Sequence, residues 1–152
     1  MSDITTVILA AGNSTRFKAS KSKLVYPLCG LPIVSHIFNI AKKISGKNIL
    51  IVSNEKNKEE LKLILNTSKL VVQKKQKGTA DAIEQVKKYV KSKNILILFG
   101  DTPLVEVKDI RKLVSKFKKS KAKASLIAFN TLEPHGYGCL LYTSPSPRDM
   151  PR

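Results

Sequence analysis

The chain has 152 residues, of which 42% are hydrophobic and 26% charged; this composition is typical of one globular domain, and no apolar run approaches the roughly 18 residues of a membrane span. The N-terminus has no charged segment followed by a long apolar stretch, and Cys29 and Cys139 lie far apart, so we expect a cytoplasmic protein with unpaired thiols. The net charge of +17 does not by itself indicate nucleic-acid binding, because the lysines are scattered, aromatic residues make up only 6%, and lysine greatly outnumbers arginine.

The first fifty residues predict a strand, a helix and a second strand. Residues 7–11 form a short apolar run that stops at a glycine, and we expect a buried strand at 4–9. Apolar side chains from 33 to 44 recur with helical spacing, and Pro32 suits the first turn of that helix. Residues 48–52 form another apolar run, which we expect to be a second buried strand.

The next elements are shorter. Asn57 can cap a helix, because Glu60 follows three residues later and the apolar residues between 61 and 65 would share one face. Residues 70–72 predict a short third strand.

The remaining pattern continues this alternation. A helix is expected from residue 78 to about residue 90, and the very apolar run at 94–99 predicts a fourth strand. Residues 110–117 carry a clear helical stripe, and 124–129 predict a fifth strand. Because the strands are continuous apolar runs separated by helices, the sequence predicts a three-layer, Rossmann-like α/β fold with a mostly parallel sheet.

Ligands of such sheets bind beyond the carboxyl ends of the strands. The first strand ends in "LAAGNSTR", where Ala10, Ala11 and Gly12 would let a ligand approach free backbone amides that suit phosphate oxygens. Arg16 can contact two phosphate oxygens at once, and Lys23 can act as a mobile point charge. A plain strand-to-helix turn is the alternative for this loop.

Two further strand ends carry polar residues. Gln73 follows the third strand, and its amide offers the donor and the acceptor needed to read a base edge. Gly78-Thr79 then begins a helix, whose free amides favour negative charge or a polar group. Asp101 follows the fourth strand and is a candidate magnesium ligand. The alternatives are a capped helix after a basic turn and an aspartate that caps its own turn.

The order of these motifs carries a resemblance. "LAAGNSTR", Lys23 four residues before a proline, "QKKQKGTADA", "FGDTPL" and "PHGYG" follow one another between residues 5 and 138. This series resembles the N-terminal uridyltransferase domain of the bacterial bifunctional N-acetylglucosamine-1-phosphate uridyltransferase/glucosamine-1-phosphate acetyltransferase. The resemblance implies uridyl transfer from UTP to N-acetylglucosamine 1-phosphate, with Mg²⁺ as cofactor.

The resemblance also implies roles for single residues. The uridine nucleotide would be held by Leu9, Ala10, Ala11, Gly12, Lys23, Gln73, Gly78 and Thr79. Arg16 and Lys23 would act on the phosphates during catalysis. Asp101 would bind magnesium, and Gly138 would contact the acetylated sugar.

The chain departs from the family pattern in two places. Ser14 stands where the family usually has glycine, although a serine still offers its amide. The family's domain also continues well beyond the "GYG" motif and is followed by an acetyltransferase half that makes trimer contacts. We therefore expect residues 1–138 to be the N-terminal part of an incomplete nucleotidyltransferase domain with doubtful activity on its own.

The last residues, 139–152, read "CLLYTSPSPRDMPR" and lack any periodicity. They resemble tails that arise when sequencing-adapter DNA is translated, so we expect a non-native or disordered tail. A related transferase with another nucleotide or sugar, a catalytically silent nucleotide-binding module and a basic nucleic-acid binder remain as alternative functions.

Overall fold

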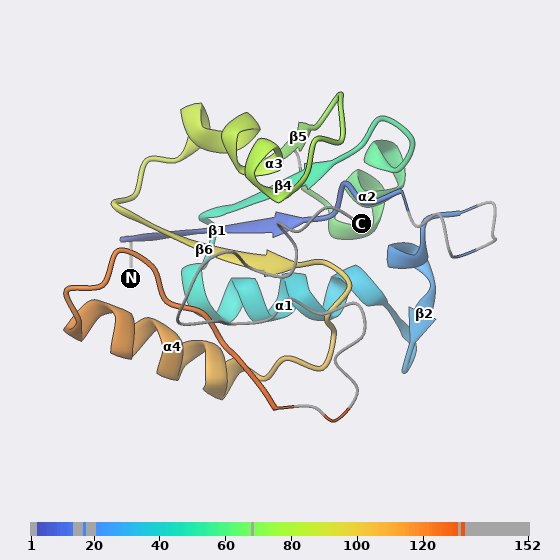
Figure 1. Ribbon diagram of the computed structural model, residues 1–152. Coiled ribbons are helices and arrows are strands. Elements are labelled where there is room, and N and C mark those ends of the chain that lie inside the picture. The colour runs from blue at the N-terminus through green and yellow to red at the C-terminus, as the bar shows by residue number, and fades with distance from the viewer. Residues whose placement is uncertain (1–2, 14–16, 18–20, 68, 131, 133–152) are drawn as a thin grey trace.

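The computed structural model describes residues 3–13, 17, 21–67, 69–130 and 132. Its main feature is a four-stranded parallel sheet in the order β5-β4-β1-β6, with β1 at the centre (Figure 1). The strands are β1 (Ile4–Leu9), β4 (Ile49–Ser53), β5 (Leu70–Val72) and β6 (Asn94–Phe99). The first four predicted strands are therefore confirmed, and so is their parallel arrangement.

Helices cover both faces of this sheet, which confirms the three-layer α/β prediction. One face packs against α1 (Ile33–Ser45), α2 (Lys58–Leu65) and α4 (Val107–Lys119). The other face packs against α3 (Thr79–Val86), and Figure 1 shows α3 on the opposite side of the sheet from α1 and α4.

Alternate residues of the central strand supply the two cores. Ile8 belongs to the core beneath α1, whereas its neighbour Val7 belongs to the core beneath α3, and both side chains are fully buried. This alternation follows from the two-residue repeat of a strand. It explains why the strand is a continuous apolar run in the sequence.

The third helix is shorter than the sequence predicts. It ends at Val86 and continues as a single 3₁₀ turn, η2 (Lys87–Tyr89). Val90 nevertheless packs against the same core as Val86, as its apolar character predicts.

A small hairpin precedes the first helix and was not predicted. It joins β2 (Pro27–Leu28) to β3 (Leu31–Pro32) through Cys29 and Gly30, which both have positive φ angles, of 49° and 80°. Positive φ at both turn residues is the pattern of a type I′ hairpin turn. Pro32 then directly precedes the helix rather than lying in its first turn.

Asn57 lies at the N-cap position of α2, but its side chain does not cap the helix. Its Nδ2 atom donates to the carbonyl of Ala10 at 2.8 Å, and its Oδ1 atom accepts from the backbone amide of Asn54 at 3.0 Å. The predicted capping box is therefore wrong, because the asparagine holds the loop after β1 instead.

The predicted strand at 124–129 is also wrong. These residues have no regular structure, and Leu126 and Ile127 are exposed. A strand needs a partner as well as β propensity, and β6, the edge strand of the described sheet, pairs only with β1.

Several sequence predictions lie outside the described residues: those for Ser14, Arg16, Gly138 and Cys139, and the boundary between 1–138 and the tail at 139–152. Within the described ranges, no helix is both long and apolar enough to cross a membrane.

Candidate functional site

The carboxyl ends of the four parallel strands bring the predicted site residues to one edge of the sheet. Backbone hydrogen bonds extend the strand pairing into the loops that follow. The amide of Gly100 donates to Leu9 at 2.9 Å, and the amide of Gln73 donates to Ser53 at 2.8 Å. The segment after β6 therefore begins beside the end of β1, and the segment after β5 begins beside the end of β4.

The loop after β1 is held from behind by buried amide side chains. Asn57 donates to the carbonyl of Ala10, and Asn54 donates to the carbonyl of Ala11 at 3.0 Å. Both asparagines are almost completely buried. A buried amide is costly unless it is paired, so these contacts fix the path of the loop.

This arrangement leaves the amides of the loop available. The carbonyls of Ala10 and Ala11 are used, whereas the backbone amides of Ala11, Gly12 and Asn13 donate to no acceptor among the described residues. A Cβ atom at Gly12 would meet no protein atom within 4 Å, so the space in front of the loop is open. Successive free amides of this kind suit an anion such as a phosphate group.

A second contact joins this loop to the one after β5. Gln76 donates to the carbonyl of Ala11 at 3.0 Å and to Oδ1 of Asn13 at 2.9 Å, while the amide of Asn13 donates back to Gln76. The two loops therefore form one continuous wall of the site.

The base-reading candidate Gln73 is buried, with 4% of its surface exposed. Its Nε2 atom donates to the carbonyl of Gly78 at 3.2 Å and to Oδ2 of Asp81 at 2.6 Å. Gly78 precedes α3 with a φ of 106°, a backbone conformation that residues other than glycine rarely adopt. Thr79 is the first residue of the helix and is exposed. Gln73, Gly78 and Thr79 thus lie together, as expected for one binding surface.

Lys23 and Asp101 form an ion pair at the opposite wall. The Nζ atom of Lys23, in η1 (Lys23–Val25), lies 2.6 Å from Oδ2 of Asp101, which follows β6. Both side chains are about 40% exposed, at 38% and 41%. The predicted phosphate-binding lysine and the predicted metal ligand are therefore neighbours, although 78 positions separate them.

Asp101 is compatible with a magnesium ion that takes most of its ligands from phosphates and water. Mg²⁺ is commonly held by one or two carboxylates together with substrate phosphates. No three His, Cys, Asp or Glu side chains of the described ranges gather into a metal cluster. The donor set at this edge therefore suits a metal that arrives with a polyphosphate rather than one held by the protein alone.

Sequence reasoning assigned no role in the site to four side chains that shape it: Asn54, Asn57, Gln76 and Asp81. The two asparagines, three positions apart between a strand and a helix, were a signal that could have indicated a role in the site. Gln76 and Asp81 stand inside the "QKKQKGTADA" segment. Their partners, however, are visible only in the folded chain.

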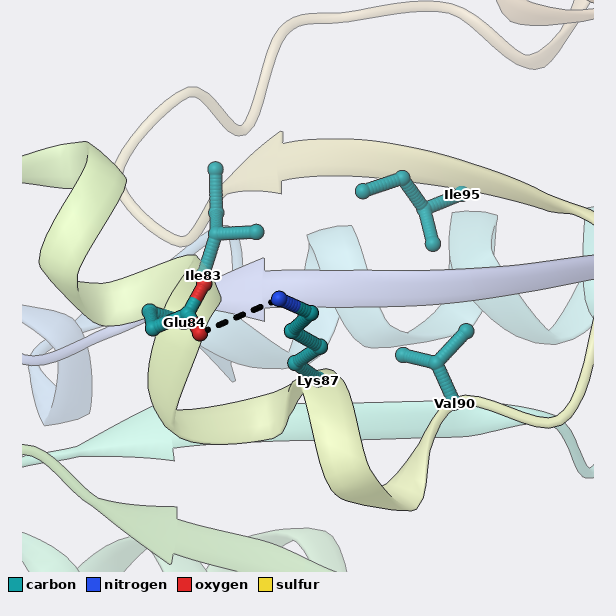
Figure 2. Close-up of a pocket in the computed structure, with 5 residues that line it drawn as sticks. All are labelled: Ile83, Glu84, Lys87, Val90 and Ile95. Carbon is teal, nitrogen blue, oxygen red and sulfur yellow. Dashed lines mark hydrogen bonds and ion pairs between the residues drawn. The ribbon is translucent and has the colours of Figure 1, made fainter.

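A pocket elsewhere on the molecule has a different character. It lies between α3 and the amino-terminal part of β6, has a volume of about 290 Å³ and is lined by Ile83, Glu84, Lys87, Val90 and Ile95 (Figure 2). Among the described residues that line it, the charged ones are Lys87 and Glu84, which form an ion pair. Since Ile95 is at the beginning of its strand, this pocket lies away from the ligand edge of the sheet.

Comparisons with known proteins agree with this arrangement. The family model of the MobA-like NTP transferase domain matches residues 6–147. The "Bifunctional protein GlmU" of Buchnera aphidicola subsp. Schizaphis graminum is 41% identical over 138 residues, which are 90% of this chain and 30% of that protein. The chain thus spans less than a third of the length of this relative.

Two solved structures share the fold at low sequence identity. The manganese complex of Rv0371C from Mycobacterium tuberculosis H37Rv has a TM-score of 0.63 and 17% identity, covering 79% of this chain and 62% of that one. A CMP:2-keto-3-deoxy-manno-octonic acid synthetase complexed with CTP also has a TM-score of 0.63, with 18% identity, covering 80% and 49% of the two chains.

Proposed function

This chain belongs to the MobA-like NTP transferase domain family, a family of nucleotidyltransferases, and from that premise we propose that it binds UTP for uridyl transfer to N-acetylglucosamine 1-phosphate. The products would be UDP-N-acetylglucosamine and pyrophosphate. The observation that carries the proposal is the loop after β1, where two carbonyls are bonded by buried asparagines and the amides of Ala11, Gly12 and Asn13 have no acceptor among the described residues.

In the proposed reaction, a phosphate oxygen of the sugar phosphate attacks the α-phosphorus of UTP in line. The bond from the α-phosphorus to the bridging oxygen breaks, and pyrophosphate leaves with that electron pair. No covalent intermediate on the protein is required, so positioning and charge neutralisation carry the rate.

The chain's own residues supply both effects. The amides of Ala11, Gly12 and Asn13 would bind phosphate oxygens, and Lys23 would move from Asp101 to the charge that develops on the transferred phosphate. Arg16 would neutralise the triphosphate in the same way.

Asp101 would hold Mg²⁺, which supplies neutralisation of phosphate charge when it is bound. The ion pair between Oδ2 of this carboxylate and the Nζ atom of Lys23 supports the proposal. By the same proposal Gly138 contacts the acetylated sugar, and longer relatives assemble as trimers through a further domain.

A related transferase with another nucleotide or sugar phosphate is the second candidate function. A synthetase that shares the fold was solved in complex with CTP, a nucleotide with a different base, and this supports the second candidate. A catalytically silent nucleotide-binding module would have the same residues around the loop but no turnover.

The chain can be tested directly for nucleotide binding. Thermal unfolding of the 152-residue chain with UTP, CTP, GTP or a DNA duplex, each with Mg²⁺ at two salt concentrations, ranks these ligands. We expect the largest rise in melting temperature with UTP. An equal rise with all three nucleotides would contradict the uridine preference, and a rise with DNA alone would favour a nucleic-acid binder.

Turnover is tested separately by pyrophosphate release from UTP and N-acetylglucosamine 1-phosphate. We expect release from a version extended with the remaining domain of a relative and little from the 152-residue chain. Robust magnesium-dependent release by the chain itself would contradict the need for those further residues.

Replacing Gln73 tests the base-reading part of the proposal. Gln73→Ala should weaken UTP binding and relax discrimination against CTP. A buried side-chain amide that finds no hydrogen-bond partner on the wrong base makes binding of that base unfavourable, and the alanine variant loses this penalty. If the ratio of the two affinities stays unchanged, Gln73 has no part in base recognition.

A further inference from the structure

The amide nitrogen of Gln73 has no proton left for a ligand. One proton is donated to the carbonyl of Gly78 at 3.2 Å and the other to Oδ2 of Asp81 at 2.6 Å. Primary amide nitrogens carry two protons, so both are used.

The amide oxygen of the same side chain is in the opposite situation. Oε1 of Gln73 accepts no hydrogen bond from the described residues. The one buried side-chain polar atom without a partner in the described ranges is Oγ of Ser53, so the Gln73 oxygen reaches the small exposed part of its residue. The group that Gln73 offers to a ligand is therefore an acceptor.

Asp81 prevents the amide from turning over. A rotation that exchanged the two ends of the amide would place Oε1 against a carboxylate and a carbonyl, which are both acceptors without a proton. The carboxylate is itself held in place, since the amide of Gln85 donates to its other oxygen at 3.4 Å. An acceptor facing an acceptor loses its hydrogen bond and is repelled as well.

We propose that Asp81 is a positioning residue for base selection: it fixes the Gln73 amide so that its oxygen meets the N3–H donor of uracil. Cytosine has an unprotonated N3 at that position, so its lone pair would face the amide oxygen. This inference rests on the proposed function, because it assumes that a pyrimidine nucleotide occupies the site.

The experiment compares the affinities of UTP and CTP for the 152-residue chain and its variants by calorimetry. In Asp81→Ala only the Gly78 carbonyl still restrains the amide, so the preference for UTP over CTP should fall on the order of tenfold. In Asp81→Asn the new amide can either accept from Nε2 or donate to Oε1 of Gln73, so it no longer excludes the reversed orientation and the preference should also fall. Glu84→Gln removes one negative charge from the same helix at an exposed position and should leave the preference unchanged.

The ratio of the UTP and CTP affinities distinguishes a positioning role of Asp81 from a purely structural one. A loss of helix stability in Asp81→Ala would weaken UTP and CTP equally, whereas the proposal requires that the ratio changes. Side-chain amide NMR of the nucleotide-free chain gives a second readout: the Gln73 amide protons should be protected from exchange in the parent chain and lose protection in Asp81→Ala.

Each outcome decides between the two proposals. A parent chain that prefers UTP while Asp81→Ala keeps the full preference would overturn the role of Asp81 and leave the proposed function intact. A parent chain without any preference for UTP would overturn the uridine proposal and the inference together. Unprotected Gln73 amide protons in the parent chain would overturn the inference alone.

Discussion

The loop after β1 and the turn after β6 lie at the same edge of the sheet but are held by different means. Buried amides of Asn54 and Asn57 tie the first from behind. The second presents Asp101, whose carboxylate is exposed and paired only with the equally exposed Lys23 among the described residues.

The loop after β1 is therefore a preformed binding surface, whereas Lys23 and Asp101 are a charge pair whose partners can be exchanged. Buried hydrogen bonds keep the amides of the loop in place before any nucleotide arrives, which reduces the entropy lost on binding. An exposed ion pair contributes little to stability, so its two partners are free to take other ligands. We therefore expect substitutions at the ion pair to change function, and substitutions behind the loop to change folding.

The largest effect is expected at the ion pair. In a version of the domain that is competent for turnover, Lys23→Ala should lower kcat about 10²–10³-fold, because one preorganised charge contact is lost. Its free energy of unfolding should change by less than about 1 kcal/mol. Arg16→Ala should have a similar effect on turnover.

The matched control is Lys62→Ala, on an exposed face of α2. It removes the same charge away from the ligand edge and should leave turnover unchanged. Near-normal turnover in Lys23→Ala would remove this lysine from the mechanism, and a large loss of stability would break the contrast between the two regions.

The second effect is on folding. Asn57→Ala removes two hydrogen bonds and leaves the Ala10 carbonyl and the Asn54 amide unpaired in the interior, which should lower the free energy of unfolding by about 2–3 kcal/mol. Denaturant unfolding of the 152-residue chain measures the change. Asn48→Ala, at an exposed position, is the control and should fall within about 0.5 kcal/mol of the parent. Equal stability of the two variants would mean that the loop is not held from behind.

The fold could be predicted because its signals are local. The apolar runs at 4–9 and 94–99 and the helical stripe at 33–44 follow from periodicity alone, and the rule for parallel sheets brings Asp101 near the loop after β1. The strand expected at 124–129 failed because pairing depends on a neighbour that residue-by-residue propensity does not specify.

The supporting residues of the site could not be predicted for a similar reason. Asn57 contacts a carbonyl 47 positions away, and Gln76 contacts one 65 positions away. The sequence around Asn57 matched a helix cap, which depends only on neighbouring residues. Those neighbours do not show whether the side chain caps the helix or bonds the distant Ala10 carbonyl. Asp81 lies in the first turn of α3, where an acidic residue is ordinary for local reasons alone, so its contact with Gln73 could not be read from the sequence.

The smallest effect is expected at Ser53, directly beneath the site. This last residue of β4 is fully buried, and its Oγ atom has no hydrogen-bond partner among the described residues. Because a buried, unpaired hydroxyl costs free energy while its removal leaves little empty space, Ser53→Ala should raise the free energy of unfolding by about 1 kcal/mol.

Differential scanning calorimetry of the nucleotide-free chain measures the change, and UTP affinity should stay the same, since the backbone contact from Ser53 to Gln73 does not involve the side chain. A loss of stability would show that the hydroxyl is paired in solution. A loss of UTP affinity alone would instead extend the preformed surface from the loop after β1 to the end of β4.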